Sequence, residues 1–249
     1  MLYRNAMVFA AHPDDEIMMA GTMAKMAADG TRVVVVQMTD GGEGYPDVAM
    51  KDTIVEMRAR EAEAANRVLG VAQRYSLGRP DMALVNDKAT LLEVIAIIRK
   101  ERPEAAFVQG DQTLHRDHLA TFALSIEALW HAGGPVSAVL GPSWKTPEIY
   151  FYKDASTPVE PFAVDVKGFG HKFFEALATQ ESQFTLFCQY MGLGSRADFE
   201  REVERLKREG GRDLEHFWIV RDVLDFDVLP ERSAHRLKQW SPPAASVPP

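Results

Sequence analysis

Apolar and polar positions along residues 1–134 alternate between a strand-like and a helix-like pattern. Short apolar runs predict four strands, and the second run is apolar on both faces, which is typical of a central parallel strand. Apolar residues three and four positions apart predict four helices, of which the first two end at Gly30 and Gly70. The expected strands are residues 7–11, 31–38, 74–77 and 104–109, and the expected helices are 16–29, 53–70, 90–100 and 116–132.

Strands and helices that alternate four times indicate an α/β fold with a doubly wound, mostly parallel sheet and right-handed crossovers. After Pro135 the pattern changes and predicts a mixed C-terminal extension. No linker separates the two parts, so residues 1–240 are expected to form one domain, and the proline-rich tail 241–249 is expected to be disordered. The extension is expected to contain strands at 148–152 and 161–166 and helices at 170–187 and 198–209.

Composition narrows the class of protein. The 249 residues carry a formal net charge of −8, which disfavours nucleic acid or an anionic membrane as a partner. A single cysteine, Cys188, rules out an internal disulfide and favours a reducing compartment. No segment approaches the roughly 20 apolar residues of a membrane span, and the first apolar stretch is too short for a signal peptide. We therefore expect a cytoplasmic protein.

Two histidine-rich stretches follow the first and fourth expected strands. They read HPDDE at residues 12–16 and HRDH at residues 115–118. In an open α/β sheet, ligands bind beyond the carboxyl ends of the strands, where the strand order reverses. If the order is 3-2-1-4, that point lies between the first and fourth strands, so the two stretches should face each other across one crevice.

The chemistry of the first stretch points to a cation. Pro13 disfavours a helical backbone at His12, which should therefore lie extended at the strand end. A helix start stabilises acids by about 0.3–1 kcal/mol each, which accounts for Glu16. Pro13 suits the first helical turn, where its missing N–H costs nothing. A helix start does not account for His12, and the successive acids Asp14 and Asp15 repel each other unless a cation lies between them.

A site built from His12, Asp15 and His118 has two imidazoles and one carboxylate and leaves a fourth position open, which is the form of a catalytic zinc site. Fe²⁺ or another divalent ion also suits this set. Zinc lowers the pKa of its bound water toward about 7 and polarises a carbonyl. Asp14 is then placed to act as the general base for that water.

Two further residues of the second stretch complete the expected site. His115, three residues before His118, is expected to stabilise an oxyanion or to protonate a leaving amine. Asp117 is expected to accept a hydrogen bond from an imidazole and fix its tautomer. Both assignments depend on the two stretches meeting at the same edge of the sheet.

The motifs AHPDDE, TDGGEG and HRDH, each placed after an expected strand, resemble those of the LmbE/PIG-L family of zinc-dependent N-acetylglucosamine deacetylases. The likeness extends to residues 58–70, 171–184 and 215–217. It implies a Rossmann-like fold and hydrolysis of an N-acyl group on a small amino sugar or its conjugate. It also implies zinc ligation by His12, Asp15 and His118.

The same resemblance assigns the remaining roles. Asp14 matches the family's base, His115 its histidine for the transition state or leaving group, and Asp117 its orienting acid. Arg58 matches a position that contacts substrate. Several members form trimers or hexamers, so a homo-oligomer is expected. One departure is Gln180, which stands where members often carry a histidine and which could reshape the substrate pocket.

Two other features allow more than one interpretation. The glycines of residues 39–46 invite a phosphate-cradle hypothesis, but they lack the G-x-G-x-x-G spacing. A rim loop over the metal, with Glu43 or Asp40 contacting sugar hydroxyls, fits better. Trp144 and Tyr152 are either sugar-stacking or structural aromatics, and aromatic side chains are most often structural.

The principal hypothesis is a zinc-dependent N-deacetylase of an N-acetylglucosamine-containing compound. An alternative keeps the metal but changes the reaction, to an amidase on a thiol conjugate or to a lyase or hydratase, because fold and metal do not fix the chemistry. A third is a non-enzymatic nucleotide-binding module, against which the missing glycine fingerprint counts.

Overall fold

The computed structural model describes residues 1–111, 113–153, 159–208, 213–220 and 236–240. The proline-rich tail lies outside these residues, so its disorder stays a prediction. Within the part of the chain that is described, no helix is both long and apolar enough to cross a membrane.

A seven-stranded sheet in the order β3-β2-β1-β4-β5-β7-β6 forms the centre of the protein. The first five strands pair in parallel, while β7 runs antiparallel to both β5 and β6. The expected order 3-2-1-4 and the mixed C-terminal extension are therefore confirmed. The strands are β1 (Asn5–Ala10), β2 (Arg32–Thr39), β3 (Val71–Arg79), β4 (Ala105–Gln109), β5 (Glu148–Lys153), β6 (Phe162–Asp165) and β7 (Leu214–Ile219).

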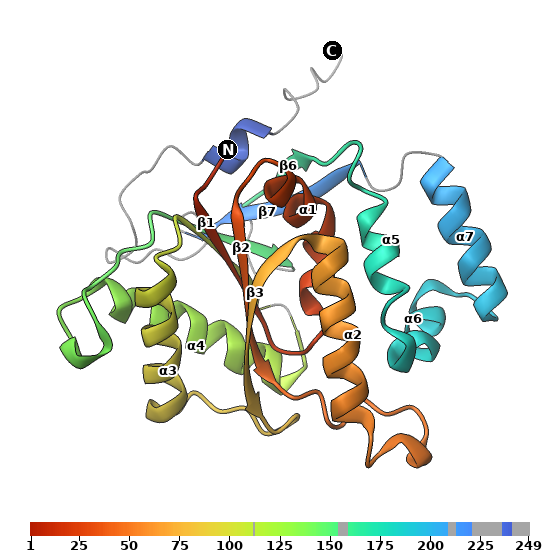
Figure 1. Cartoon of the computed structure of the whole chain (residues 1–249), viewed down its shortest axis with the longest axis horizontal. Helices are drawn as coiled ribbons and strands as arrows, with labels where there is room; N and C mark the ends of the chain where they lie inside the picture. Colours follow the sequence, from red (N-terminus) through yellow and green to blue (C-terminus); the bar gives the residue numbers. More distant parts are fainter. Residues whose placement is uncertain (112, 154–158, 209–212, 221–235, 241–249) are drawn as a thin grey trace.

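Helices cover both faces of the sheet (Figure 1). Helices α1, α2 and α5 lie on one face, and α3 and α4 lie on the other. Each face of the sheet has its own hydrophobic core. Successive residues of β2 point to opposite faces, so Val35 packs in the core beneath α1, α2 and α5, and Val34 packs in the core beneath α3 and α4. The helices are α1 (Ala20–Ala28), α2 (Ile54–Leu69), α3 (Lys88–Glu101), α4 (Arg116–Gly133), α5 (Lys172–Leu177), α6 (Phe184–Met191) and α7 (Arg196–Arg208).

The helix expected at residues 16–29 begins differently. A 3-10 turn, η1 (Asp15–Met19), comes first, and the α-helix starts only at Ala20. The carboxylate of Glu215, on β7, accepts hydrogen bonds from the backbone N–H of Gly21 (2.9 Å) and Thr22 (2.8 Å). A side chain distant in sequence therefore caps this helix, and satisfies donors that a helix start leaves unpaired.

The single helix expected at residues 170–187 is wrong. The chain forms α5, then a 3-10 turn, η4 (Glu181–Gln183), and then α6. The reason is Glu61 on α2, whose carboxylate accepts hydrogen bonds from Ser182 N (2.6 Å) and Ser182 Oγ (2.7 Å). These bonds outside the segment replace those of a continuous helix, and Gln180 takes a non-helical backbone conformation.

Candidate functional site

The loops that follow β1 and β4 meet at the carboxyl edge of the sheet, as the strand order requires. His12 lies just beyond the end of β1, and His118 lies in the first turn of α4, which follows β4. His12 Nδ1 is 3.1 Å from His118 Nε2. The two histidine-rich stretches are therefore in direct contact.

Asp15 completes a compact set of three donor groups. Its Oδ2 is 3.4 Å from His12 Nδ1, and its Oδ1 is 3.3 Å from His118 Nε2. The backbone N–H of His12 also donates to Asp15 Oδ2 (2.8 Å), which fixes the carboxylate. Donors about 2.0–2.2 Å from a tetrahedral Zn²⁺ lie roughly 3.3–3.6 Å from one another. The spacing and chemistry of this set fit a divalent metal ion.

His115 extends the cluster. Its ring lies 4.7 Å from that of His12 and 4.8 Å from that of His118, and ring nitrogens of all three lie within 4.8 Å of one another. His115 Nδ1 accepts a hydrogen bond from the backbone N–H of Asp117 (3.3 Å) at the start of α4. The neutral ring therefore carries its proton on Nε2.

Asp81 is a member of the cluster that the sequence interpretation missed. Its Oδ1 is 3.1 Å from His12 Nε2, closer than Asp117 Oδ2 at 3.4 Å. Because β3 extends to Arg79, two residues beyond its expected end, Asp81 falls at the same carboxyl edge as the histidines. The available signal was an acid two residues after a strand end. Asp117, which is fully buried, also accepts from Met82 N (2.6 Å) and holds this loop in place.

The electrostatics of the cluster favour positive charge. Burial disfavours a charged His12, but the hydrogen bonds to Asp15 and Asp81 outweigh it and raise the pKa of His12 to about 10. Burial opposes ionisation of Asp81 too, yet the hydrogen bond to His12 lowers the pKa of this carboxyl below its ordinary value. Burial and the neighbouring His12 and His118 lower the pKa of His115, which favours its neutral form.

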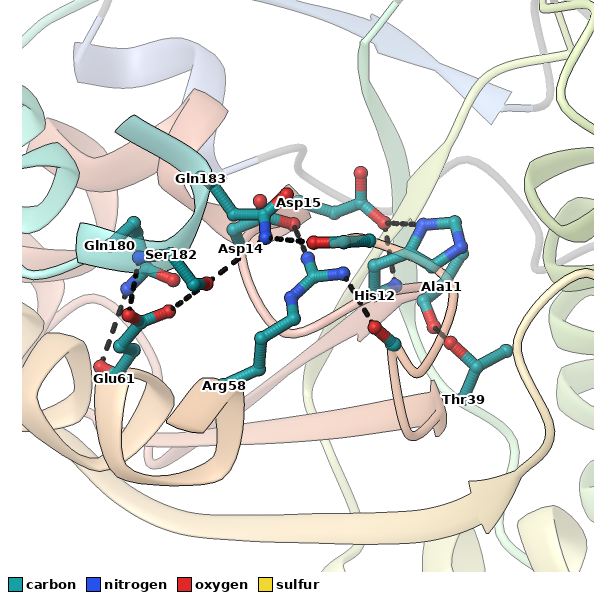
Figure 2. A network of polar contacts seen from close by, with 12 residues as sticks. Ala11, His12, Asp14, Asp15, Thr39, Arg58, Glu61, Gln180, Ser182 and Gln183 are labelled. Carbon is teal, nitrogen blue, oxygen red and sulfur yellow. Dashed lines mark hydrogen bonds and ion pairs between the residues drawn. The ribbon is translucent and has the colours of Figure 1, made fainter. Parts of the chain in front are cut away.

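Asp14 points away from this donor set and pairs with an arginine. Arg58 of α2 is 3% exposed, and its Nη2 donates to Asp14 Oδ1 (3.0 Å) while its Nη1 donates to the carbonyl of Gly41 (3.2 Å). Figure 2 shows the guanidinium between the carboxylate and the loop. Arg58 therefore holds Asp14 and the loop backbone together.

The glycine-rich loop after β2 makes room for that arginine. A Cβ atom at Gly41 would lie 2.7 Å from Arg58 Nη1, and one at Gly44 would lie 2.5 Å from it. Gly41 also has φ +71°, which favours glycine. The loop therefore cradles a guanidinium of the protein itself, which removes the basis for the phosphate-cradle hypothesis.

A cavity of about 720 Å³ opens over the cluster. Asp14, Glu43 and Arg58 line it, together with His12, Asp15, Asp81, His115 and His118. Gln183 also lines it and donates through Nε2 to the carbonyl of Gly44 (2.6 Å). Gln180 does not; it is fully buried, and its amide donates to Glu61 O (3.3 Å) and Thr179 Oγ1 (2.8 Å). The glutamine that stands where family members often carry a histidine therefore does not line the cavity.

Three other residues have structural roles. Trp144 donates from Nε1 to the carbonyl of Pro103 (2.8 Å), and Tyr152 donates to the carbonyl of Phe9 (2.9 Å). Neither lines the cavity, so the structural interpretation of these aromatics holds. Glu16, expected only to favour a helix start, is fully buried and forms an ion pair with Arg74 of β3.

Comparison with known proteins places these features in a family. Residues 7–129 match the PIG-L family model, described as GlcNAc-PI de-N-acetylase. The chain is 31% identical over 185 residues to diacetylchitobiose deacetylase of Thermococcus kodakarensis, which covers 70% of this chain and 67% of that protein. The chain therefore belongs to the PIG-L/LmbE family.

Two further proteins agree with this placement. A 1D-myo-inositol 2-acetamido-2-deoxy-alpha-D-glucopyranoside deacetylase of Catenulispora acidiphila is 31% identical over 178 residues, a match that spans 59% of this chain and 55% of that protein. The structure of N,N'-diacetylchitobiose deacetylase from Pyrococcus horikoshii superimposes with a TM-score of 0.72 at 25% identity, covering 87% of this chain and 84% of that one.

Proposed function

We propose that this protein is a metal-dependent hydrolase that removes the N-acetyl group from an N-acetylglucosamine-containing small molecule or glycoconjugate. The observation that carries the proposal is the set of three donor groups 3.1–3.4 Å apart in a cavity that also holds an arginine-bound carboxylate, Asp14. The deacetylase names of the family model and of the relatives agree with it.

His12, Asp15 and His118 would hold the metal, and two imidazoles with one carboxylate suit zinc. Bound there, zinc would supply an acidified water and polarise the carbonyl of the amide. Asp81 accepts the hydrogen bond from His12 Nε2–H, so the proton that His12 gives up to bind a metal would come from Nδ1, whose lone pair would then face the same site as the other two ligand groups. Asp117 supports the same tautomer from 3.4 Å.

Asp14 is the proton carrier in this proposal. Arg58 engages its Oδ1, and among the described residues no hydrogen bond is donated to its Oδ2. That oxygen can accept a proton from the attacking water and then deliver it to the amide nitrogen as the amine leaves. The guanidinium fixes the direction of the carboxylate, so we assign Arg58 to positioning Asp14 rather than to direct substrate contact.

His115 stabilises the charge that develops on the carbonyl oxygen. Its Nδ1 accepts from the backbone of Asp117, so the Nε2–H is left to donate to the oxyanion. Glu43 lies on the cavity wall beyond the cluster, where its carboxylate can accept from sugar hydroxyls. The homo-oligomeric state stays a prediction.

The experiment combines metal content with product release. We expect the purified protein to carry about one zinc per chain by elemental analysis and to release acetate from at least one compound in a panel of N-acetylglucosamine derivatives. His118→Ala should lose the metal and the activity. His131→Ala, which replaces a histidine at the far end of α4, is the matched control and should keep both. A wild-type metal content in His118→Ala would remove His118 from the ligand set.

The same panel distinguishes the alternative reactions. Cleavage of an amide in a thiol conjugate, without acetate release from any sugar, would replace the deacetylase proposal by an amidase. Addition of water to a small unsaturated acid would replace it by a hydratase.

A further inference from the structure

The cavity over the metal-ligand cluster has two unlike walls. The wall at the carboxyl edge of the sheet carries the histidines and carboxylates described above. Apart from Asp15 and Gln183, the lining residues from η1 to α1 and from α5 to α6 are apolar, and together they are called the apolar wall. The side chains that form this apolar wall are Ile17, Met18, Phe173, Phe174, Leu177, Leu186 and Phe187.

Several of these side chains are not fully buried. Phe173, Leu186 and Phe187 are only partly buried, and Met18 is 36% exposed. They do not belong to a closed core on their cavity side, because the same cavity that holds the catalytic cluster reaches them. An occupant of that cavity therefore removes apolar surface from water, which favours binding.

Hydrogen-bonding groups are scarce on this wall. Among the described residues, segment 172–191 contributes one polar side chain to the cavity, Gln183. Its Nε2 already donates to the carbonyl of Gly44 (2.6 Å) and to Ser182 Oγ (3.0 Å). A second sugar ring against this wall would lose hydrogen bonds to water without gaining others, which is unfavourable.

The volume leaves room beyond one sugar. At about 720 Å³, the cavity is of the size that encloses a whole drug-sized ligand, for which pockets range from about 300 to 1,000 Å³. The histidines and carboxylates suffice for the amide and one sugar ring. Beyond them the lining consists mainly of apolar side chains, with Lys153 as the one charged group besides these and Arg58 among the described lining residues.

Building on the proposed deacetylase function, we propose that the substrate carries an apolar substituent that lies against the apolar wall while its amide faces the metal-ligand cluster. The substituent has two sources with the same chemistry: an aglycone on the sugar, or an N-acyl chain longer than acetyl. In either case the substrate is an amphiphilic amino-sugar conjugate and not a chitin disaccharide.

The test compares four compounds by release of the free amine. These are the methyl and hexyl glycosides of N-acetylglucosamine, N-hexanoylglucosamine and N,N'-diacetylchitobiose. Each methylene buried raises affinity by about fourfold, so partial burial of a hexyl chain should raise kcat/KM by at least about 30-fold over the methyl glycoside. A preference for the hexyl glycoside identifies the aglycone as the source, and a preference for N-hexanoylglucosamine identifies the acyl chain.

The proposal would be overturned if the methyl glycoside or diacetylchitobiose were hydrolysed with a kcat/KM equal to or above those of both the hexyl glycoside and N-hexanoylglucosamine. If no compound is hydrolysed, the deacetylase function fails, and a binding measurement still decides about the wall. Hexyl glucoside and methyl glucoside contain no amide, so calorimetry compares their affinities without catalysis. We expect the hexyl compound to bind at least tenfold more tightly, and equal affinities would overturn the proposal.

A matched pair of variants places the effect on the wall. Leu186→Asn puts a polar group on the apolar wall and should reduce the hexyl-to-methyl affinity ratio at least threefold. Leu92→Asn makes the same exchange at a partly buried leucine of α3, on the other face of the sheet and outside the cavity. It should leave the ratio unchanged. If Leu186→Asn also leaves the ratio unchanged, the wall does not bind the substituent.

Discussion

The two ends of the central sheet both bury polar clusters, but the clusters differ in charge balance. At the amino ends of the parallel strands, Glu148 accepts hydrogen bonds from Tyr3 (2.7 Å) and Tyr150 (2.6 Å) and pairs with Arg236 (2.9 Å). Arg236 also pairs with Glu104, which binds Arg4. Two carboxylates therefore face two arginines.

At the carboxyl ends, carboxylates outnumber permanent cations. Asp14, Asp15, Asp81 and Asp117 lie around one arginine, Arg58, and the three histidines. A cavity opens on this cluster.

The charge of a buried carboxylate such as Glu148 is balanced by an arginine, and two hydroxyl groups donate hydrogen bonds to it. Such a group stabilises the folded chain and is not available to bind a ligand. A cluster with excess negative charge costs stability unless a cation joins it. The contrast separates structural from functional polar residues better than burial does, since Glu148 and Asp117 are both almost completely buried. Four predictions test it, from the largest expected effect to the smallest.

Asp14→Asn should lower kcat by about 10³-fold, because the amide cannot take the proton of the attacking water. Metal content should stay within error of the wild-type value, and the chain should stay folded although Arg58 loses a charged partner. Activity on the preferred compound, circular dichroism and elemental analysis check this, with the exposed Asp52→Asn as the control. Near-normal turnover in Asp14→Asn would remove Asp14 as the base.

Glu148→Gln should have the opposite signature. Loss of the charge removes one partner of Arg236, which is partly exposed and keeps Glu104, so the free energy of unfolding should fall by about 1–3 kcal/mol. Urea unfolding measures the loss, and the folded fraction should retain the wild-type kcat. Glu127→Gln changes a partly exposed carboxylate and should cost less than about 0.5 kcal/mol. A kcat that falls with Glu148→Gln would break the division between the two ends.

Arg58→Lys tests whether this residue positions Asp14 or binds substrate. Lysine cannot reach Asp14 and Gly41 with a planar fork, so the base shifts, and kcat should fall by about 10- to 100-fold. KM should change less than about threefold. Arg60→Lys, an exposed neighbour on α2 paired with Glu56, should change neither. A rise in KM with an unchanged kcat would assign Arg58 to the substrate.

Glu104→Gln should give the smallest effect, with a defined pH dependence. Burial opposes it, but hydrogen bonds from Arg4 and Arg236 hold the pKa of Glu104 below its ordinary value of 4.5. A lowered pKa stabilises the fold at pH values above the ordinary one, and the contribution disappears as pH falls through the lowered value. The difference in unfolding free energy from wild type should be about 0.5 kcal/mol at pH 7 and vanish in acid. A difference that persists in acid would mean that charge is not its cause.

Hydrophobic period and turn residues were enough to predict the eight elements of the first half, with ends shifted by a few residues. The expected strand order then predicted that the loops after β1 and β4 meet. This places His12 and His118 together, as observed. These predictions succeeded because burial on both faces of a parallel sheet leaves a strong apolar signal in each strand.

Predictions failed where a side chain far away in sequence supplied the deciding hydrogen bonds. Glu61 breaks the helix expected at 170–187, and Glu215 caps α1. Asp81 joined the cluster because β3 runs two residues past its apolar stretch. Local pattern contains none of this information, since the partners are 121, 194 and 69 positions apart.

The sequence by itself indicated the first four strands, their order and the residue types at the carboxyl edge, because apolar spacing and a short motif are local properties; it did not indicate β7. Only the tertiary structure decided which of those residues act together. It directed Arg58 to Asp14 through the space left by Gly41 and Gly44, and it placed the apolar wall in the same cavity as the cluster. Both depend on distances of a few ångströms between segments far apart along the chain, and packing of the whole fold sets those distances.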